Sequence, residues 1–130
     1  RTGASVAIVG GAAERPLGEA VAGQLRAPSR VLCGETTLGD LVGVLKNLLV
    51  LLTNDSGPMH LAAALGTPLV AVFGSTDWTE TSPVADCARV VREETACAPC
   101  LLRECPIDHR CMTRVGVLGV AKAALEQVAS

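Results

Sequence analysis

A polar turn in the middle of the chain brings together residues that could bind an anion. The turn has the sequence TNDSGPMH, residues 53–60, and lies between two apolar segments. Its Asn, Asp, Ser and Gly residues favour turns and helix N-caps, and Pro58 suits the first position of a helix because no backbone hydrogen bond is needed there. A helix that begins here has free N–H groups and a partial positive charge, so it can hold a phosphate without a lysine. The alternative is that the same residues only cap the helix.

Two side chains of this turn carry further expectations. His60 falls in the first turn of the predicted helix, where the helix field disfavours the imidazolium and a neutral ring can hydrogen-bond a ligand. The Asp55 carboxylate should repel a phosphate unless it bonds to backbone donors or sugar hydroxyls. We therefore assign Asp55 to loop order and sugar contact.

A second stretch gathers five potential metal ligands within 15 residues: Cys97, Cys100, Cys105, His109 and Cys111. The pair Cys97 and Cys100 has the spacing of a zinc knuckle, whereas the other three lack a second paired spacing. Structural thiols or disulfides, a structural zinc and a redox pair all stay open for this stretch.

Alternating strands and helices are predicted to position both stretches. Apolar runs indicate five strands, at 6–9, 30–33, 48–52, 69–73 and 88–92, and helices at 17–26, 38–46, from Pro58 to about 65, and at about 114–128. Such short connections predict an α/β fold, a Rossmann-like parallel sheet with helices on both faces. We expect residues 1–130 to form a single, partial domain with a cysteine-rich loop at 97–111. Residues 74–77 follow a strand at the same sheet edge and could line the site.

The composition restricts the partners. Hydrophobic residues make up 49% of the chain and aromatic residues only 2%, so the core must consist of Ala, Val and Leu. The net charge of −2 lacks the excess of positive charge that is typical of nucleic-acid-binding proteins, so no nucleic-acid partner is expected. No apolar run reaches roughly the 18 residues of a membrane span, so no transmembrane segment is predicted.

The segment DSGPMHLAAALGTPLVAVFGSTD, residues 55–77, with Thr81-Ser82-Pro83 just after it, closely resembles the signature of the bacterial heptosyltransferases of glycosyltransferase family 9. Members have the GT-B fold of two Rossmann-like halves and transfer heptose from ADP-heptose to the lipopolysaccharide inner core of Gram-negative bacteria. The resemblance covers residues 6–128 and implies the C-terminal half, which holds the donor. The cysteine-rich segment, residues 97–112, further resembles the subtype that adds the second inner-core heptose.

The resemblance also implies roles for individual residues. The donor loop that contacts the diphosphate and the sugar would consist of Asp55, Ser56, Gly57, Pro58, Met59 and His60. Glu14 and Thr36 or Thr37 fall where the family contacts ribose and adenine. From the residues alone, Glu14 could equally be a solvated helix charge, and Thr36 could be the N-cap of the helix that begins near Leu38.

The chain reads as a fragment, because it lacks an initiator methionine and, by the resemblance, the N-terminal half that binds the acceptor and carries the catalytic base. We expect it to bind ADP-heptose but not to catalyse transfer alone, so no catalytic residue is assigned. No cofactor is expected apart from a structural zinc at the cysteine cluster. The expected location is the cytoplasm, at the inner face of the inner membrane. The alternative is a non-catalytic nucleotide-binding or metal-binding module that keeps the fold.

Overall fold

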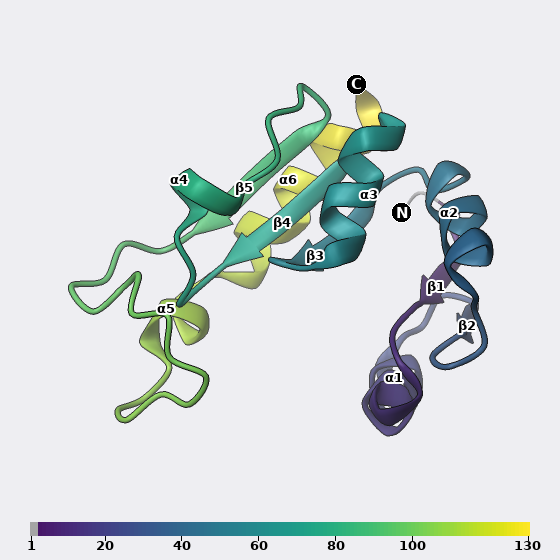
Figure 1. Ribbon diagram of the computed structural model, residues 1–130. Coiled ribbons are helices and arrows are strands. Elements are labelled where there is room, and N and C mark those ends of the chain that lie inside the picture. The colour runs from purple at the N-terminus through teal and green to yellow at the C-terminus, as the bar shows by residue number, and fades with distance from the viewer. Residues whose placement is uncertain (1–2) are drawn as a thin grey trace. The chain divides into compact units, whose positions relative to one another are not determined.

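The computed structural model describes residues 3–130 and divides into two compact units, between Gly43 and Val44 (Figure 1). In the first unit, β1 (Val6–Ile8) pairs with β2 (Ser29–Val31). In the second unit, β3 (Leu51–Asn54), β4 (Leu69–Phe73) and β5 (Ala88–Arg92) form a sheet in that order. Every strand pair is parallel, which confirms the predicted α/β class. The grouping into one domain stays a prediction.

The first unit follows a strand, helix, strand order. After β1 come the short 3-10 helix η1 (Ala12–Glu14) and α1 (Arg15–Gln24), and β2 leads to α2 (Leu38–Lys46), which ends in the second unit. The loops that follow β1 and β2 meet where the Gly34 N–H donates to the Gly10 carbonyl at 3.0 Å. Gly34 has a φ of +77°, so a residue without a side chain suits this turn.

The second unit is a three-layer arrangement. Figure 1 shows α3 (Gly57–Leu65) and α6 (Val117–Ala129) on opposite faces of the β3–β4–β5 sheet, and both helices contact the central strand β4. A strand covered on both faces reads as a continuous apolar run, as β4 does. The largest fully buried side chains all lie in this unit: Phe73, Leu45, Met59, Leu69 and Val70.

Helix α6 forms where it was predicted but buries a different face. Five apolar residues recur at helical spacing along this helix and predict its buried face: Val117, Ala121, Ala124, Leu125 and Val128. This stripe is largely outside, with Val117 82% and Leu125 56% exposed. Ala123 and Gln127 are buried instead. The Gln127 amide donates to the Cys87 carbonyl at 3.2 Å and to the Leu69 carbonyl at 3.4 Å. A polar residue can therefore face the sheet because hydrogen bonds compensate its burial.

Other boundaries shift by a few residues. The apolar run at 48–52 predicted a strand, but β3 begins only at Leu51, because Leu48 still donates to the Leu45 carbonyl in the turn that ends α2. Two four-residue helices were not predicted, α4 (Trp78–Thr81) and α5 (Arg110–Thr113).

Candidate functional site

The polar turn lies at the carboxyl end of β3, the sheet edge at which parallel α/β proteins bind ligands. β3 ends at Asn54, Ser56 is the N-cap with extended backbone angles, and α3 begins at Gly57. Pro58 is therefore the second helical residue rather than the first. The structure thus has the strand, turn and helix order that an anion site at a helix N-terminus requires.

The capping alternative can be examined at Ser56. The Ser56 side chain makes no capping hydrogen bond to α3. Its hydroxyl lies 2.9 Å from the Thr53 hydroxyl instead. The first N–H groups of α3 therefore receive no acceptor from the residue whose position is best suited to supply one.

Asp55 has a partner across the turn. The Thr81 hydroxyl, at the end of α4, lies 2.9 Å from the Asp55 carboxylate and 2.9 Å from the Asp77 carbonyl, and it can donate to either oxygen. A carboxylate held by a hydroxyl can order the loop, and the sugar contact expected of Asp55 stays a prediction. Thr81 itself was not predicted as a site residue, although it lies in the Thr-Ser-Pro segment that was singled out.

The remaining two members of the turn point in different directions. Met59 is fully buried in the core, so only its backbone N–H is available at the helix N-terminus. His60 is exposed, one residue further along α3. The sequence alone could not show which of the two side chains is buried, because both follow Pro58 within a single helical turn.

A cavity of about 170 Å³ lies between the turn and the cysteine-rich segment. Asn54 and Asp55 line one side, and Arg103, Cys105 and His109 belong to the segment that lines the other. The remaining lining residues come from the end of β4, the loop after it and the rest of the segment: Val72, Gly74, Ser75, Thr76, Leu102, Cys111 and Met112. Residues from two stretches that lie far apart in the sequence thus line the same cavity.

The cysteine-rich segment is fixed to the loop after β4. The Leu101 N–H donates to the Ser75 carbonyl at 2.9 Å, and Cys111 is only 7% exposed. Met112 packs against Gly74 so closely that a Cβ added to Gly74 would lie 2.8 Å from the Met112 Cγ. These contacts make the segment a wall of the cavity.

The five potential metal ligands do not assemble. No three His, Cys, Asp or Glu side chains among residues 3–130 are arranged to hold a metal ion. All six cysteines are free thiols, and Cys105 accepts a hydrogen bond from the His109 N–H at 3.3 Å. The arrangement does not fit a tetrahedral zinc site, so the geometry gives no support to the zinc alternative.

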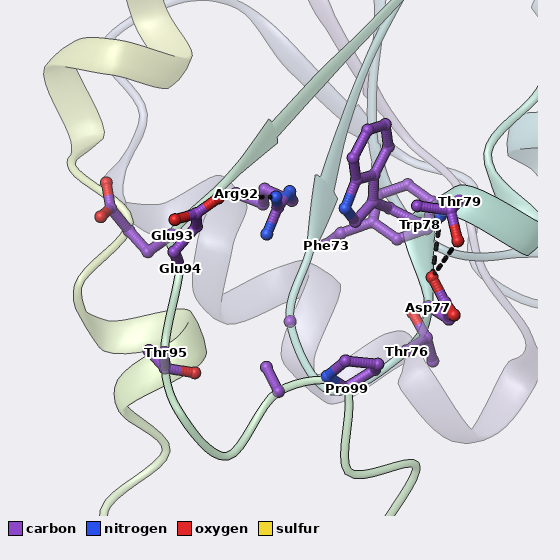
Figure 2. A pocket seen from close by; sticks show the side chains of 12 residues that line it. Phe73, Thr76, Asp77, Trp78, Thr79, Arg92, Glu93, Glu94, Thr95 and Pro99 are labelled. Carbon is purple, nitrogen blue, oxygen red and sulfur yellow. Dashed lines mark hydrogen bonds and ion pairs between the residues drawn. The ribbon is translucent and has the colours of Figure 1, made fainter.

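A second cavity, of about 400 Å³, lies between α4 and the end of β5 (Figure 2). The Arg92 guanidinium lies 4.8 Å from the centre of the Trp78 ring and 3.2 Å from Glu94. The Thr79 hydroxyl and then its N–H, at 2.6 and 3.0 Å, hold the pKa of the Asp77 carboxyl below its ordinary value, with a smaller contribution from Arg92. Glu93 also lines this cavity, so its carboxylates outnumber its one arginine and it disfavours anions.

The predicted loop 74–77 lies between the two cavities. Gly74 and Thr76 line both of them, whereas Ser75 lines only the smaller and Asp77 only the larger. The loop therefore borders cavities at this sheet edge, and its part in a donor site stays a prediction.

The candidate nucleoside residues lie in the first unit, where two of them have structural roles. The Glu14 carboxylate accepts from the Gly11 N–H at 2.7 Å. Thr37 and Asp40 cap α2 reciprocally, with the Asp40 N–H donating to the Thr37 hydroxyl at 3.1 Å and the Thr37 N–H to the Asp40 carboxylate at 3.0 Å. The Thr37 N–H, and then its hydroxyl, lower the pKa of Asp40. The N-cap is thus Thr37 and not Thr36, which is half-buried.

A family model for glycosyltransferase family 9 (heptosyltransferase) matches residues 1–110. The chain belongs to glycosyltransferase family 9. This confirms the family that the segment from Asp55 to Asp77 indicated.

Relatives of this family 9 chain include the lipooligosaccharide heptosyltransferase 2 of Campylobacter jejuni, 42% identical over 62% of the chain, and that of Haemophilus influenzae, 38% identical over 69%. The lipopolysaccharide heptosyltransferase 2 of Escherichia coli is 36% identical over 69% of the chain. The chain spans only 26 to 27% of the length of these curated relatives. These relatives are named heptosyltransferase 2, which is the subtype that the cysteine-rich segment resembles.

Solved structures of the family resemble the chain over nearly its whole length. A family 9 glycosyltransferase from Veillonella parvula matches 98% of the chain and 37% of its own length, with a TM-score of 0.81 and 25% identity. The E. coli ADP-heptose lipopolysaccharide heptosyltransferase II matches 97% of the chain and 38% of its own length, with a TM-score of 0.71 and 32% identity. These neighbours confirm the Rossmann-like GT-B fold. Within residues 3–130 no helix is long and apolar enough to cross a membrane.

Proposed function

We propose that this chain is the donor-binding part of a heptosyltransferase and that it binds ADP-heptose at the carboxyl edge of the β3–β4–β5 sheet. The names of its relatives support heptosyl transfer, and the name of the E. coli structure supports the ADP-linked donor. The acceptor, the lipopolysaccharide inner core, and the base that deprotonates it would belong to a part of the enzyme outside this chain. The reaction would take place at the cytoplasmic face of the inner membrane.

The observation that carries the proposal is the N-terminus of α3, which the Ser56 side chain leaves uncapped at a ligand-binding sheet edge. The backbone N–H groups of Gly57 and Met59 can donate to the donor diphosphate, while Pro58 has no N–H to offer. The same partial positive charge would stabilise the diphosphate as the glycosidic bond breaks, which is electrostatic catalysis by preorganised donors.

The neighbouring side chains suit the sugar end of the donor. Asp55 is held by the Thr81 hydroxyl, so its second oxygen can accept from a heptose hydroxyl. His60 is exposed one turn from Ser56 and can hydrogen-bond the sugar or the phosphate beside it. In this arrangement the two negatively charged groups are kept apart. The donor diphosphate lies at the N-terminus of α3, and the Asp55 carboxylate contacts the heptose hydroxyls.

Gly57 provides a sharp test. A Cβ added there would meet no atom of the protein within 4 Å, so Gly57→Val should keep the fold and fill only space that a ligand would use. Gly119→Val is the matched control, because Gly119 also lies in the first turn of a helix and an added Cβ there also meets nothing within 4 Å.

The measurement is a calorimetric titration of the folded chain with ADP and with UDP. We expect ADP to bind more tightly than UDP, Gly57→Val to weaken ADP binding by about tenfold or more, and Gly119→Val to leave it unchanged. The proposal fails if the folded chain binds neither nucleotide, or if Gly57→Val binds ADP as tightly as the control does.

A further inference from the structure

We infer that the cysteine-rich segment completes the donor site and that Arg103 binds the phosphate next to the sugar. This inference rests on the proposed function and deepens it, because it assigns a role to a segment for which the family signature implies none. The cavity of about 170 Å³ is lined by Asn54 and Asp55 of the 53–60 turn and by residues of the cysteine-rich segment.

Arg103 is the one permanently charged cation in the lining of this cavity. Asn54 and Asp55 of the turn line the same cavity. A guanidinium can donate two parallel hydrogen bonds to a phosphate, and it brings a full positive charge to the cavity.

Arg103 is also unengaged. Among residues 3–130 it has no ion pair and no side-chain hydrogen bond, whereas Arg110 in the same segment donates to Asp108 at 2.9 Å and Arg92 pairs with Glu94 at 3.2 Å. The pKa of Arg110 is raised, mainly by its hydrogen bond to Asp108. A free guanidinium in a cavity that also holds Asp55 is available for an anionic ligand.

The backbone of the segment is anchored on both sides of Arg103, whose side chain is exposed. Two residues before it, the Leu101 N–H is bonded to the Ser75 carbonyl, and further along the buried Cys111 and the contact of Met112 with Gly74 anchor the segment to the end of β4. The buried thiol thus acts as a packing residue, and the segment supports a binding residue without a metal.

The lining also indicates the class of ligand. Asn54 and Asp55 provide amide and carboxylate groups that suit sugar hydroxyls, and Arg103 provides a group that suits a phosphate. A glycosyl phosphate combines both features in one small group. We therefore place the sugar–phosphate junction of the donor in this cavity.

The test compares Arg103→Ala with Arg114→Ala, in titrations with ADP and with adenosine. Arg114 belongs to the residues just after the segment, is exposed, and does not line the cavity, so its loss changes the net charge equally. We expect Arg103→Ala to weaken ADP binding about tenfold, with adenosine binding unchanged and Arg103→Lys in between. Arg114→Ala should bind ADP as the unmodified chain does.

The outcomes separate the two proposals. If Gly57→Val abolishes ADP binding but Arg103→Ala equals Arg114→Ala, the inference is wrong and the donor site at α3 stands. Equal losses of ADP and adenosine binding in Arg103→Ala would also overturn the inference, because they indicate a structural effect rather than a phosphate contact. If the unmodified folded chain does not bind ADP, the proposed function fails and this inference fails with it.

Discussion

At the residue scale, a carboxylate beside a phosphate site needs a partner that keeps it from repelling the ligand. Thr81 supplies that partner to Asp55 at 2.9 Å, from a helix 26 positions further along the chain. The Ser56 hydroxyl is engaged with Thr53 in the same way. The turn is thus ordered by side chains that leave the helix N-terminus open.

Thr81→Val tests this ordering role. The substitution keeps the shape of the side chain but removes the hydroxyl that donates to Asp55. We expect the Kd for ADP-heptose to rise about fivefold, the value of one hydrogen bond of about 1 kcal/mol, because the turn loses order and the carboxylate becomes free to face the phosphate. Calorimetric titration measures this, and Thr81→Ser, which retains the hydroxyl, should bind as the unmodified chain does. An unchanged Kd in Thr81→Val would show that the Asp55 contact does not matter for binding.

At the element scale, the chain shows what a sequence can predict and where it falls short. The central strand β4, the start of α2 and the last strand β5 follow from apolar runs and turn residues, and all three have the predicted bounds. The buried face of α6 could not be predicted, because Gln127 is polar and its two carbonyl partners are distant in sequence. For the same reason the cavity wall around Arg103 was missed: it depends on contacts of Leu101 and Met112 with the loop after β4.

Two glycines at element ends give a matched prediction. Gly34 and Gly66 both have positive φ, +77° and +74°, but a Cβ added at Gly34 would lie 2.8 Å from the Ala12 Cα, whereas at Gly66 it would meet nothing within 4 Å. Gly66→Ala should lower the free energy of unfolding by about 1 kcal/mol, the cost of the left-handed conformation alone. Gly34→Ala adds a backbone clash and should cost about 3 kcal/mol.

Urea unfolding combined with amide hydrogen exchange can check both values, because exchange reports on the β1–β2 and β3–β4–β5 sheets separately. Equal losses in the two variants would mean that the turn around Gly34 relaxes without strain.

At the scale of the whole molecule, the sequence indicated the family but not the division of the described residues into two compact units, and the donor loop stays a prediction. The family follows from one contiguous segment, whereas compactness depends on contacts between distant residues. The candidate site residues also fall into two groups: Glu14, Thr36 and Thr37 in the first unit, and the 53–60 turn with Arg103 in the second.

The chain spans about a quarter of the length of its curated relatives, and we predict that it binds the donor without transferring heptose. This prediction rests on the proposed function, in which the base that deprotonates the acceptor would belong to a part of the enzyme outside this chain. An assay of ADP release from ADP-heptose, with and without a heptose-bearing lipopolysaccharide acceptor, should show no acceptor-dependent release. Heptose transfer by the isolated chain would refute this prediction.

The donor diphosphate is proposed to bind at the N-terminus of α3, and an NMR titration of the ¹⁵N-labelled chain with ADP would report on the backbone amides of that turn one by one. We predict the largest amide shifts at Gly57, Met59 and His60, with a smaller set along the cysteine-rich segment around Arg103. Pro58 has no backbone N–H and therefore gives no amide signal. Shifts centred instead on the cavity around Trp78 and Arg92, or no shifts at a high ADP concentration, would contradict a phosphate site at the N-terminus of α3.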